Sequence, residues 1–160
     1  MEDDFNIKSI LKKNMFKGFL PKELLSIKSP LEKATKIYQF IRDHYTSNDE
    51  LGGLNDNKLR KAFRKKRGSI TEINLSLMNA LHAAGIHAEV LLLSTRDHSI
   101  PTQDYPEMTD FNYIIVKAIV NGNVYFLDAT DKNAPFGILP LRALNYKGRA
   151  IDFVAQSYWE

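Results

Sequence analysis

The sequence of 160 residues contains no cysteine, which limits the chemistry that its side chains can perform. The missing thiols exclude disulfides, thiolate metal sites and a cysteine nucleophile together. Two hydroxyls, those of Ser69 and Thr71, stand where an apolar helical pattern begins. A hydroxyl is a weak nucleophile at neutral pH and needs a general base beside it. Ser69 lies three residues before Glu72, which favours a helix N-cap and capping box over a nucleophile.

The four histidines are the first candidates for such a base. His44 and His82 fall on helical patterns, His87 begins an extended segment, and only His98 lies in a polar loop that could swing toward Ser69. Their spacing does not resemble a zinc motif. The sequence therefore predicts no metal site and no cofactor.

Two elements would have to position these side chains. Residues 70–84 repeat apolar side chains at helical spacing, which predicts a central buried helix that Gly85 ends in a left-handed conformation. Residues 113–120 and 124–127 flank Asn121-Gly122, the strongest hairpin signal in the chain. A further strand is predicted over residues 87–93.

The remaining segments complete the predicted fold. Helices are expected over residues 5–11, from Pro21 as first helical residue, from the capping sequence 29–32, and over 55–68. A last strand is expected over 150–155. The pattern predicts an α+β fold, in which N-terminal helices precede a central buried helix packed on an antiparallel β-sheet.

The positive charge of the chain is concentrated in one segment. The net charge is +3, and residues 58–67 hold seven of the 22 lysines and arginines. Leu59, Ala62 and Phe63 recur there at helical spacing, so the cations should coat the outer face of a helix. A solvated face is favoured over a surface for a phosphate or an acidic partner. Nucleic acid is disfavoured because aromatic residues are not interleaved with the cations and no binding motif is present.

Length and composition fit a single domain over residues 1–160. With 44% hydrophobic and 26% charged residues, the chain can bury a core without disulfides. No apolar run is long enough to predict a membrane span, and the first twenty residues do not resemble a signal peptide. Aromatic residues at the C-terminus favour a piece excised from a longer chain.

Three segments together resemble the transglutaminase-like (papain-like) superfamily: Gly68 to Glu72, Phe111 to Val116 and Phe126 to Thr130. In that family a cysteine at a helix start, a histidine on a strand and an aspartate on the next strand form a catalytic triad. The helix N-terminus lowers the thiol pKa, and the aspartate orients the histidine. The resemblance covers about residues 30–150.

The resemblance assigns each triad position to a residue of this chain. Ile70 stands two residues after Gly68 and fifteen before Gly85, where the family has its cysteine. Tyr113 stands fifteen residues before Asp128, where the family has its histidine, and a shift by one would place Asn112 there. Asp128 matches the family aspartate. The aliphatic and phenolic side chains cannot perform the chemistry of the residues they replace.

The resemblance therefore implies a catalytically inactive binding or scaffolding module of a larger bacterial protein. A peptide or glycan is the expected ligand of the degenerate cleft, with other domains of the same polypeptide as partners. The groove residues implied are Ser69, Glu72, Asn74, Arg96, His98 and Asn112. The alternative is an amidase or peptidase of the same fold with a relocated nucleophile. The implied compartment is the periplasm or cell envelope, with the cytoplasm as the alternative.

Three contacts are also expected. A hydrogen bond should join the Tyr113 hydroxyl, or a nearby N–H, to Asp128. Asn74 should be a buried residue that ties loops together. Arg96 should form an ion pair with an aspartate.

Overall fold

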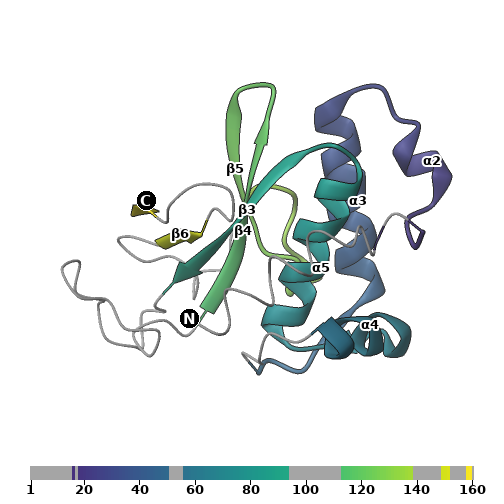
Figure 1. The fold of residues 1–160 in the computed structure, drawn as a ribbon, viewed down its shortest axis with the longest axis vertical. Coiled ribbons are helices and arrows are strands. Elements are labelled where there is room, and N and C mark those ends of the chain that lie inside the picture. The colour runs from purple at the N-terminus through teal and green to yellow at the C-terminus, as the bar shows by residue number, and fades with distance from the viewer. Residues whose placement is uncertain are drawn as a thin grey trace.

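The computed structural model describes most of the chain, with gaps. The described residues are 16, 18–50, 56–93, 113–138, 149–151 and 158–159. The helix predicted over 5–11, the side chains of Arg96, His98 and Asn112, and the expected Arg96 ion pair all lie outside them. Helices come first along the chain and pack on one side of a β-sheet (Figure 1), so the α+β prediction is confirmed.

The two first described helices begin at prolines, in different ways. Helix α3 (Pro30–His44) starts as predicted, with Pro30 in its first turn and the Ser29 hydroxyl accepting from the Glu32 N–H at 3.4 Å. Helix α2 (Lys22–Leu25) differs from the prediction, because Pro21 is its N-cap and not its first helical residue. Pro21 has a ψ of 138°, which belongs to extended backbone.

The basic helix is shorter than predicted. Helix α4 (Asp56–Lys65) does not continue to Gly68, because Lys66 adopts a left-handed φ of 58°. Strand β2 (Arg67–Gly68) follows and pairs in parallel with β1 (Thr46–Ser47). This short ladder anchors the chain immediately before the central helix.

Helix α5 (Ile70–Ala83) is the predicted central helix. The capping box is complete: the Ser69 hydroxyl accepts from the Glu72 N–H at 3.2 Å, and Glu72 Oε2 accepts from the Ser69 N–H at 2.8 Å. Gly85, with a φ of +77°, follows the helix end as predicted. Every residue from Ile70 to Leu81 except Glu72 is buried, so α5 is covered on nearly all sides.

The sheet is antiparallel and has the strand order β5-β4-β3-β6-β7. The predicted hairpin joins β4 and β5, and both turn residues, Asn121 and Gly122, have positive φ. The last strand predicted over 150–155 is found in part: β6 begins one residue earlier, at Arg149, and includes Ile151, while residues 152–155 lie outside the described residues. The strands are β3 (His87–Leu93), β4 (Tyr113–Val120), β5 (Asn123–Leu127), β6 (Arg149–Ile151) and β7 (Tyr158–Trp159).

The core lies where α5 is held between α3 and the sheet (Figure 1). Helix α3 buries one face, formed by Ala34, Ile37, Tyr38 and Ile41. Its C-cap Tyr45 shares a 2.8 Å hydrogen bond with the Ser76 hydroxyl on α5. Residues 113–118 of β4 are buried without alternation, so both faces of this strand are covered. Within the described ranges, no helix is long and apolar enough to cross a membrane.

Candidate functional site

Asp128, the first residue after β5, is the centre of a buried polar cluster. Its side chain has 0% exposure. The Tyr113 hydroxyl, at the first residue of β4, donates to Oδ2, so the predicted contact between these two residues is confirmed. Oδ1 accepts from the Thr130 hydroxyl at 2.7 Å, the Thr130 N–H at 3.1 Å and Asn74 Nδ2 at 3.0 Å. Donors from α5, β4 and the 128–130 turn therefore surround the carboxylate.

Asn74 joins the central helix to both strands of the hairpin. Nδ2 also donates to the Ile114 carbonyl at 2.8 Å, and Oδ1 accepts from the Ala129 N–H at 3.0 Å. The side chain is fully buried, as predicted. Because an unsatisfied buried amide is costly, this set of partners fixes the position of α5 against the strand ends.

Ile70 lies one turn before Asn74 on the same face of α5, because residues four apart on a helix share a face. Its side chain is 4% exposed and belongs to the hydrophobic core. Its backbone N–H donates to the Glu50 carbonyl at 2.8 Å. The helix start thus presents an aliphatic group one turn away from the residue that binds Asp128.

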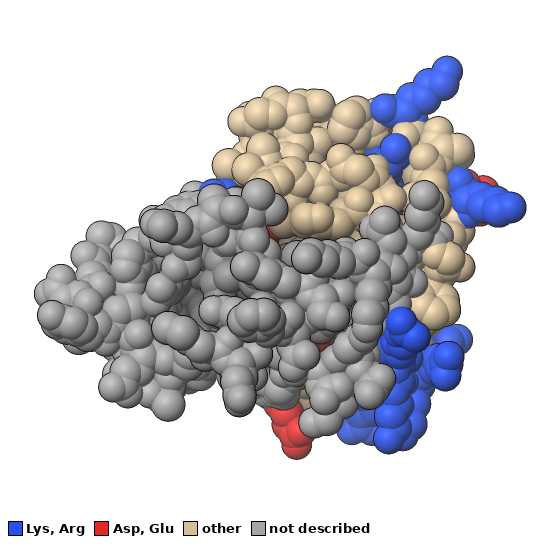
Figure 2. Space-filling model, in the orientation of Figure 1, with Lys and Arg blue, Asp and Glu red and all other residues tan. Residues whose placement is uncertain are grey.

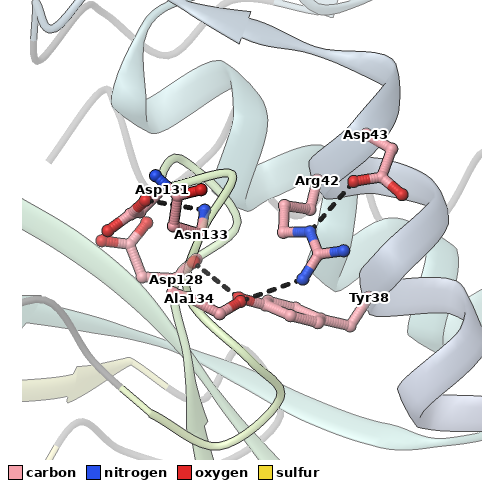
Figure 3. A network of polar contacts seen from close by, with 7 residues as sticks. All are labelled: Tyr38, Arg42, Asp43, Asp128, Asp131, Asn133 and Ala134. Atoms are coloured by element: carbon pink, nitrogen blue, oxygen red, sulfur yellow. Dashed lines mark hydrogen bonds and ion pairs between the residues drawn. The ribbon is translucent and has the colours of Figure 1, made fainter.

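A second set of contacts ties the segment after β5 to α3 (Figure 3). The Tyr38 hydroxyl reaches two carbonyl oxygens, that of Asp128 at 3.2 Å and that of Ala134 at 2.8 Å. Arg42 donates to the Ala134 carbonyl at 3.1 Å and to Asp43 at 3.0 Å. Burial raises the pKa of Tyr38 to about 12, against the opposing effect of Arg42. Hydrogen bonds from helix α3 therefore fix the position of the backbone at Asp128 and Ala134.

Sequence patterns indicated only part of this arrangement. The sequence patterns assigned no polar contact to Tyr38, although a buried tyrosine hydroxyl usually needs a partner. Thr130 was not singled out. Its signal was available, since an aspartate two residues before an N–H commonly forms an Asx-turn.

The comparisons with known proteins agree with this fold. The profile of the Transglutaminase-like superfamily matches residues 20–125, which is more than half of the chain. This chain belongs to the transglutaminase-like superfamily. No curated protein matches it.

Solved structures with the same fold come from longer proteins. A candidate protease from Parabacteroides distasonis has a TM-score of 0.64 and 19% identity over 95% of this chain and 29% of its own. A candidate cysteine protease from Cytophaga hutchinsonii has a TM-score of 0.55 and 13% identity over 96% and 54% of the two chains. A protein described as a TGase has a TM-score of 0.50 and 12% identity over 83% and 32%. The transglutaminase-like domain thus spans about a third to a half of the structures it resembles.

The described histidines of this transglutaminase-like domain form hydrogen bonds with groups other than the hydroxyls of Ser69 and Thr71. Ring Nε2 of His44 contacts the Phe63 carbonyl at 2.7 Å, and that of His82 contacts the Ala88 carbonyl at 2.6 Å. His87 contacts Glu89 at 3.0 Å. Ser69 is committed to its capping box, and the buried hydroxyl of Thr71 makes no hydrogen bond with the described residues. In the part of the chain that the structure describes, neither hydroxyl has a histidine as its base.

Strand β4 also carries one member of a buried charged pair that the sequence did not predict, four residues after Tyr113. Lys117 and Glu89 face each other across β4 and β3, with Nζ and Oε2 3.8 Å apart and both side chains buried. The pair belongs to the covered sheet and not to the Asp128 cluster. Over the described ranges, no group of three histidine, aspartate or glutamate side chains is placed to hold a metal ion.

Proposed function

We propose that this domain is a catalytically inactive member of its superfamily and acts as a binding or scaffolding module. The observation that carries the proposal is the Tyr113 hydroxyl on the Asp128 carboxylate, in a chain without cysteine. In a triad, that carboxylate would orient an imidazole. Here it accepts a hydrogen bond from a phenol.

The side chains at the three positions support inactivity on chemical grounds. The Tyr113 hydroxyl donates a hydrogen bond to Asp128 and, unlike an imidazole, has no basic ring nitrogen that could take a proton from a nucleophile. Ile70 has no lone pair and cannot attack a carbonyl. Tyr113 and Asp128 would be the remnant of a histidine–aspartate contact, kept because the buried carboxylate still needs donors.

Binding without turnover suits the apolar helix start. In the groove that the resemblance implies, the buried side chain of Ile70, 4% exposed, would close the floor with an aliphatic group in place of a reactive one. Of the residues expected around that groove, Glu72 is partly exposed, whereas Ser69 and Asn74 are buried beneath it. The similar structures are much longer than this chain, which supports a place beside other domains of one bacterial polypeptide. The periplasm or cell envelope is the compartment that we propose from the family resemblance alone.

The alternative is an amidase or peptidase of the same fold with a relocated nucleophile. The descriptions of two similar structures as candidate proteases favour it. Ser69 and Thr71 flank Ile70 and are the hydroxyls nearest in sequence. The described histidines do not activate either one, which weighs against this alternative.

A serine-directed fluorophosphonate probe separates the two proposals. The native chain should label no more than its Ser69→Ala and Thr71→Val variants, and no more than a heat-denatured sample. Labelling of the native chain that disappears with either substitution would establish a relocated nucleophile and contradict inactivity.

Binding is tested with peptide and glycan arrays. The native chain and an Ile70→Ser variant of confirmed fold should be compared on the same arrays. We expect a subset of spots to bind the native chain and to lose signal with the variant. Array binding that is identical for both would remove Ile70 from the binding surface.

A further inference from the structure

Helix α4 and the residues after it form an exposed cationic surface. Six cations are exposed here, while Leu59 and Ala62 on the other side of the helix are buried. Figure 2 shows the blue side chains over α4 as one cluster at the lower right, with no red among them in this view. The six cations are Arg60, Lys61, Arg64, Lys65, Lys66 and Arg67.

Five of these cations, Lys61, Arg64, Lys65, Lys66 and Arg67, form no ion pair within 4.0 Å with the described residues. Glu72, the next acidic residue along the chain, accepts from the Ser69 N–H instead. Lys61 and Lys65 lie four apart on one helix face, a like-charge spacing that costs helix stability. A surface whose like charges cost stability, and in which five cations have no carboxylate partner among the described residues, is suited to an external anion.

An exposed aromatic ring borders the cationic helix. Phe19 is 38% exposed and stacks on Phe63 of α4, with ring centroids 4.8 Å apart and an interplanar angle of 29°. The buried Phe16 packs edge-on against Phe63 at 5.2 Å and holds the group in the core. Packing against Phe63 and Phe16 therefore holds the exposed ring of Phe19 at the surface, beside the cations.

We propose that these six cations and Phe19, here called the α4 surface, dock on an anionic lipid bilayer. Clusters of four to eight lysines and arginines on an amphipathic helix attract anionic lipid headgroups, and aromatic rings favour the membrane interface. The apolar side of α4 is used inside the protein, so the contact is peripheral and mainly electrostatic.

A bilayer fits this surface better than a nucleic acid does. The described outward positions of α4 carry lysine and arginine alone, with neither aromatic rings for stacking bases nor amides for reading base edges. Phe63, the aromatic residue of α4, is already stacked on Phe19 and His44. The exterior of a helix suits a flat bilayer, and the docking does not depend on whether the cleft binds a ligand.

Co-sedimentation of the whole chain with lipid vesicles tests this proposal. Vesicles with about 30 mol% phosphatidylglycerol in phosphatidylcholine should bind the chain, whereas pure phosphatidylcholine vesicles should not. Binding at about 50 mM salt should largely disappear at about 500 mM, because salt screens the charges. Absence of binding to the anionic vesicles at low salt would overturn the proposal.

Two triple variants with equal charge make the test specific. Lys61→Gln, Arg64→Gln and Lys65→Gln together should weaken vesicle binding on the order of a hundredfold. The control, Lys22→Gln, Lys28→Gln and Lys36→Gln, removes the same charge from exposed positions on α2, on α3 and between them, and should lose less than about threefold. Equal losses in the two triples would overturn the assignment to α4.

A third comparison distinguishes the bilayer from a nucleic acid. Phe19→Ala should weaken vesicle binding several-fold and leave any binding to duplex DNA unchanged. Tighter binding to duplex DNA than to vesicles at matched salt would overturn the choice of a bilayer.

Discussion

The Asp128 cluster and the α4 surface use polar residues in opposite ways. Around Asp128, donors from three parts of the fold converge on one buried carboxylate. On α4, Lys61, Arg64 and Lys65 are exposed and form no ion pair with the described residues. Polar groups that hydrogen-bond one another inside the protein hold the fold in place. Exposed charges that are not neutralised within the protein can bind another molecule. Asp128, which we propose stands at the position of the family aspartate, thus has a structural role in this chain.

The largest effect should come from removing the centre of the buried cluster. Asp128→Ala leaves the Asn74 amide and the Tyr113 hydroxyl without their acceptor, so the free energy of unfolding should fall by about 4 kcal/mol. Urea denaturation measures the change. Asp128→Asn keeps one acceptor oxygen and should lose about half as much. A loss under about 1 kcal/mol for the alanine variant would mean that the cluster is not a structural unit.

A smaller loss is expected when one donor is removed. Tyr113→Phe deletes the hydroxyl on Oδ2 and should lower the free energy of unfolding by about 1–3 kcal/mol. Tyr125→Phe is the matched control, because the half-buried Tyr125 makes no hydrogen bond through its hydroxyl to the described residues. Its effect should stay within about 0.5 kcal/mol. Equal losses of stability in the two variants would show that the hydrogen bond from Tyr113 to Asp128 does not stabilise the fold.

Alkaline pH should weaken the link between α3 and the Asp128 segment. The pKa of Tyr38 is raised from 10.0 to about 12, mainly by burial, and the pKa of Tyr45 is raised by the same cause. A folded pKa above the unfolded one means that stability is full below pH 10 and falls as the pH rises toward 12. Tyr38→Phe should reduce this fall in urea midpoint between pH 10 and 12, and an unchanged slope would contradict the shift.

The smallest effect should appear on α4, with the opposite sign. Lys61→Glu replaces a like-charge pair with an attractive Glu–Lys pair at four-residue spacing, so the free energy of unfolding should rise by about 0.5–1 kcal/mol. Lys61→Gln should give about half of that gain. A loss of stability in both variants would show that Lys61 supports the fold.

Local signals in the sequence were sufficient for the elements but not for their contacts. The capping box of Ser69 and Glu72 and the Asn121-Gly122 turn depend on neighbours within a few residues, and both were predicted. The contact of Tyr38 with Ala134 spans 96 residues and follows only from the packing of α3. The burial of Asn74 was predicted, but its partners on both hairpin strands were not.

The end of the basic helix shows the same limit. A run of lysines and arginines does not indicate where a helix stops, and the parallel pairing of β2 with β1 overrides helical propensity at Arg67 and Gly68. The contact of Tyr113 with Asp128 was predictable because the family resemblance implies a histidine–aspartate contact at these positions, and the hairpin brings the start of β4 close to the end of β5.

Restoring the missing groups tests the central claim most directly. Ile70→Cys and Tyr113→His should be combined, and the rate of thiol alkylation by iodoacetamide compared with that of Ile70→Cys alone at about pH 6.5. If Asp128 still marks the base position, the imidazole should lower the thiol pKa and raise the rate about tenfold or more. Equal rates in the two variants, with the fold intact, would contradict the claim that Ile70, Tyr113 and Asp128 occupy the positions of a former triad.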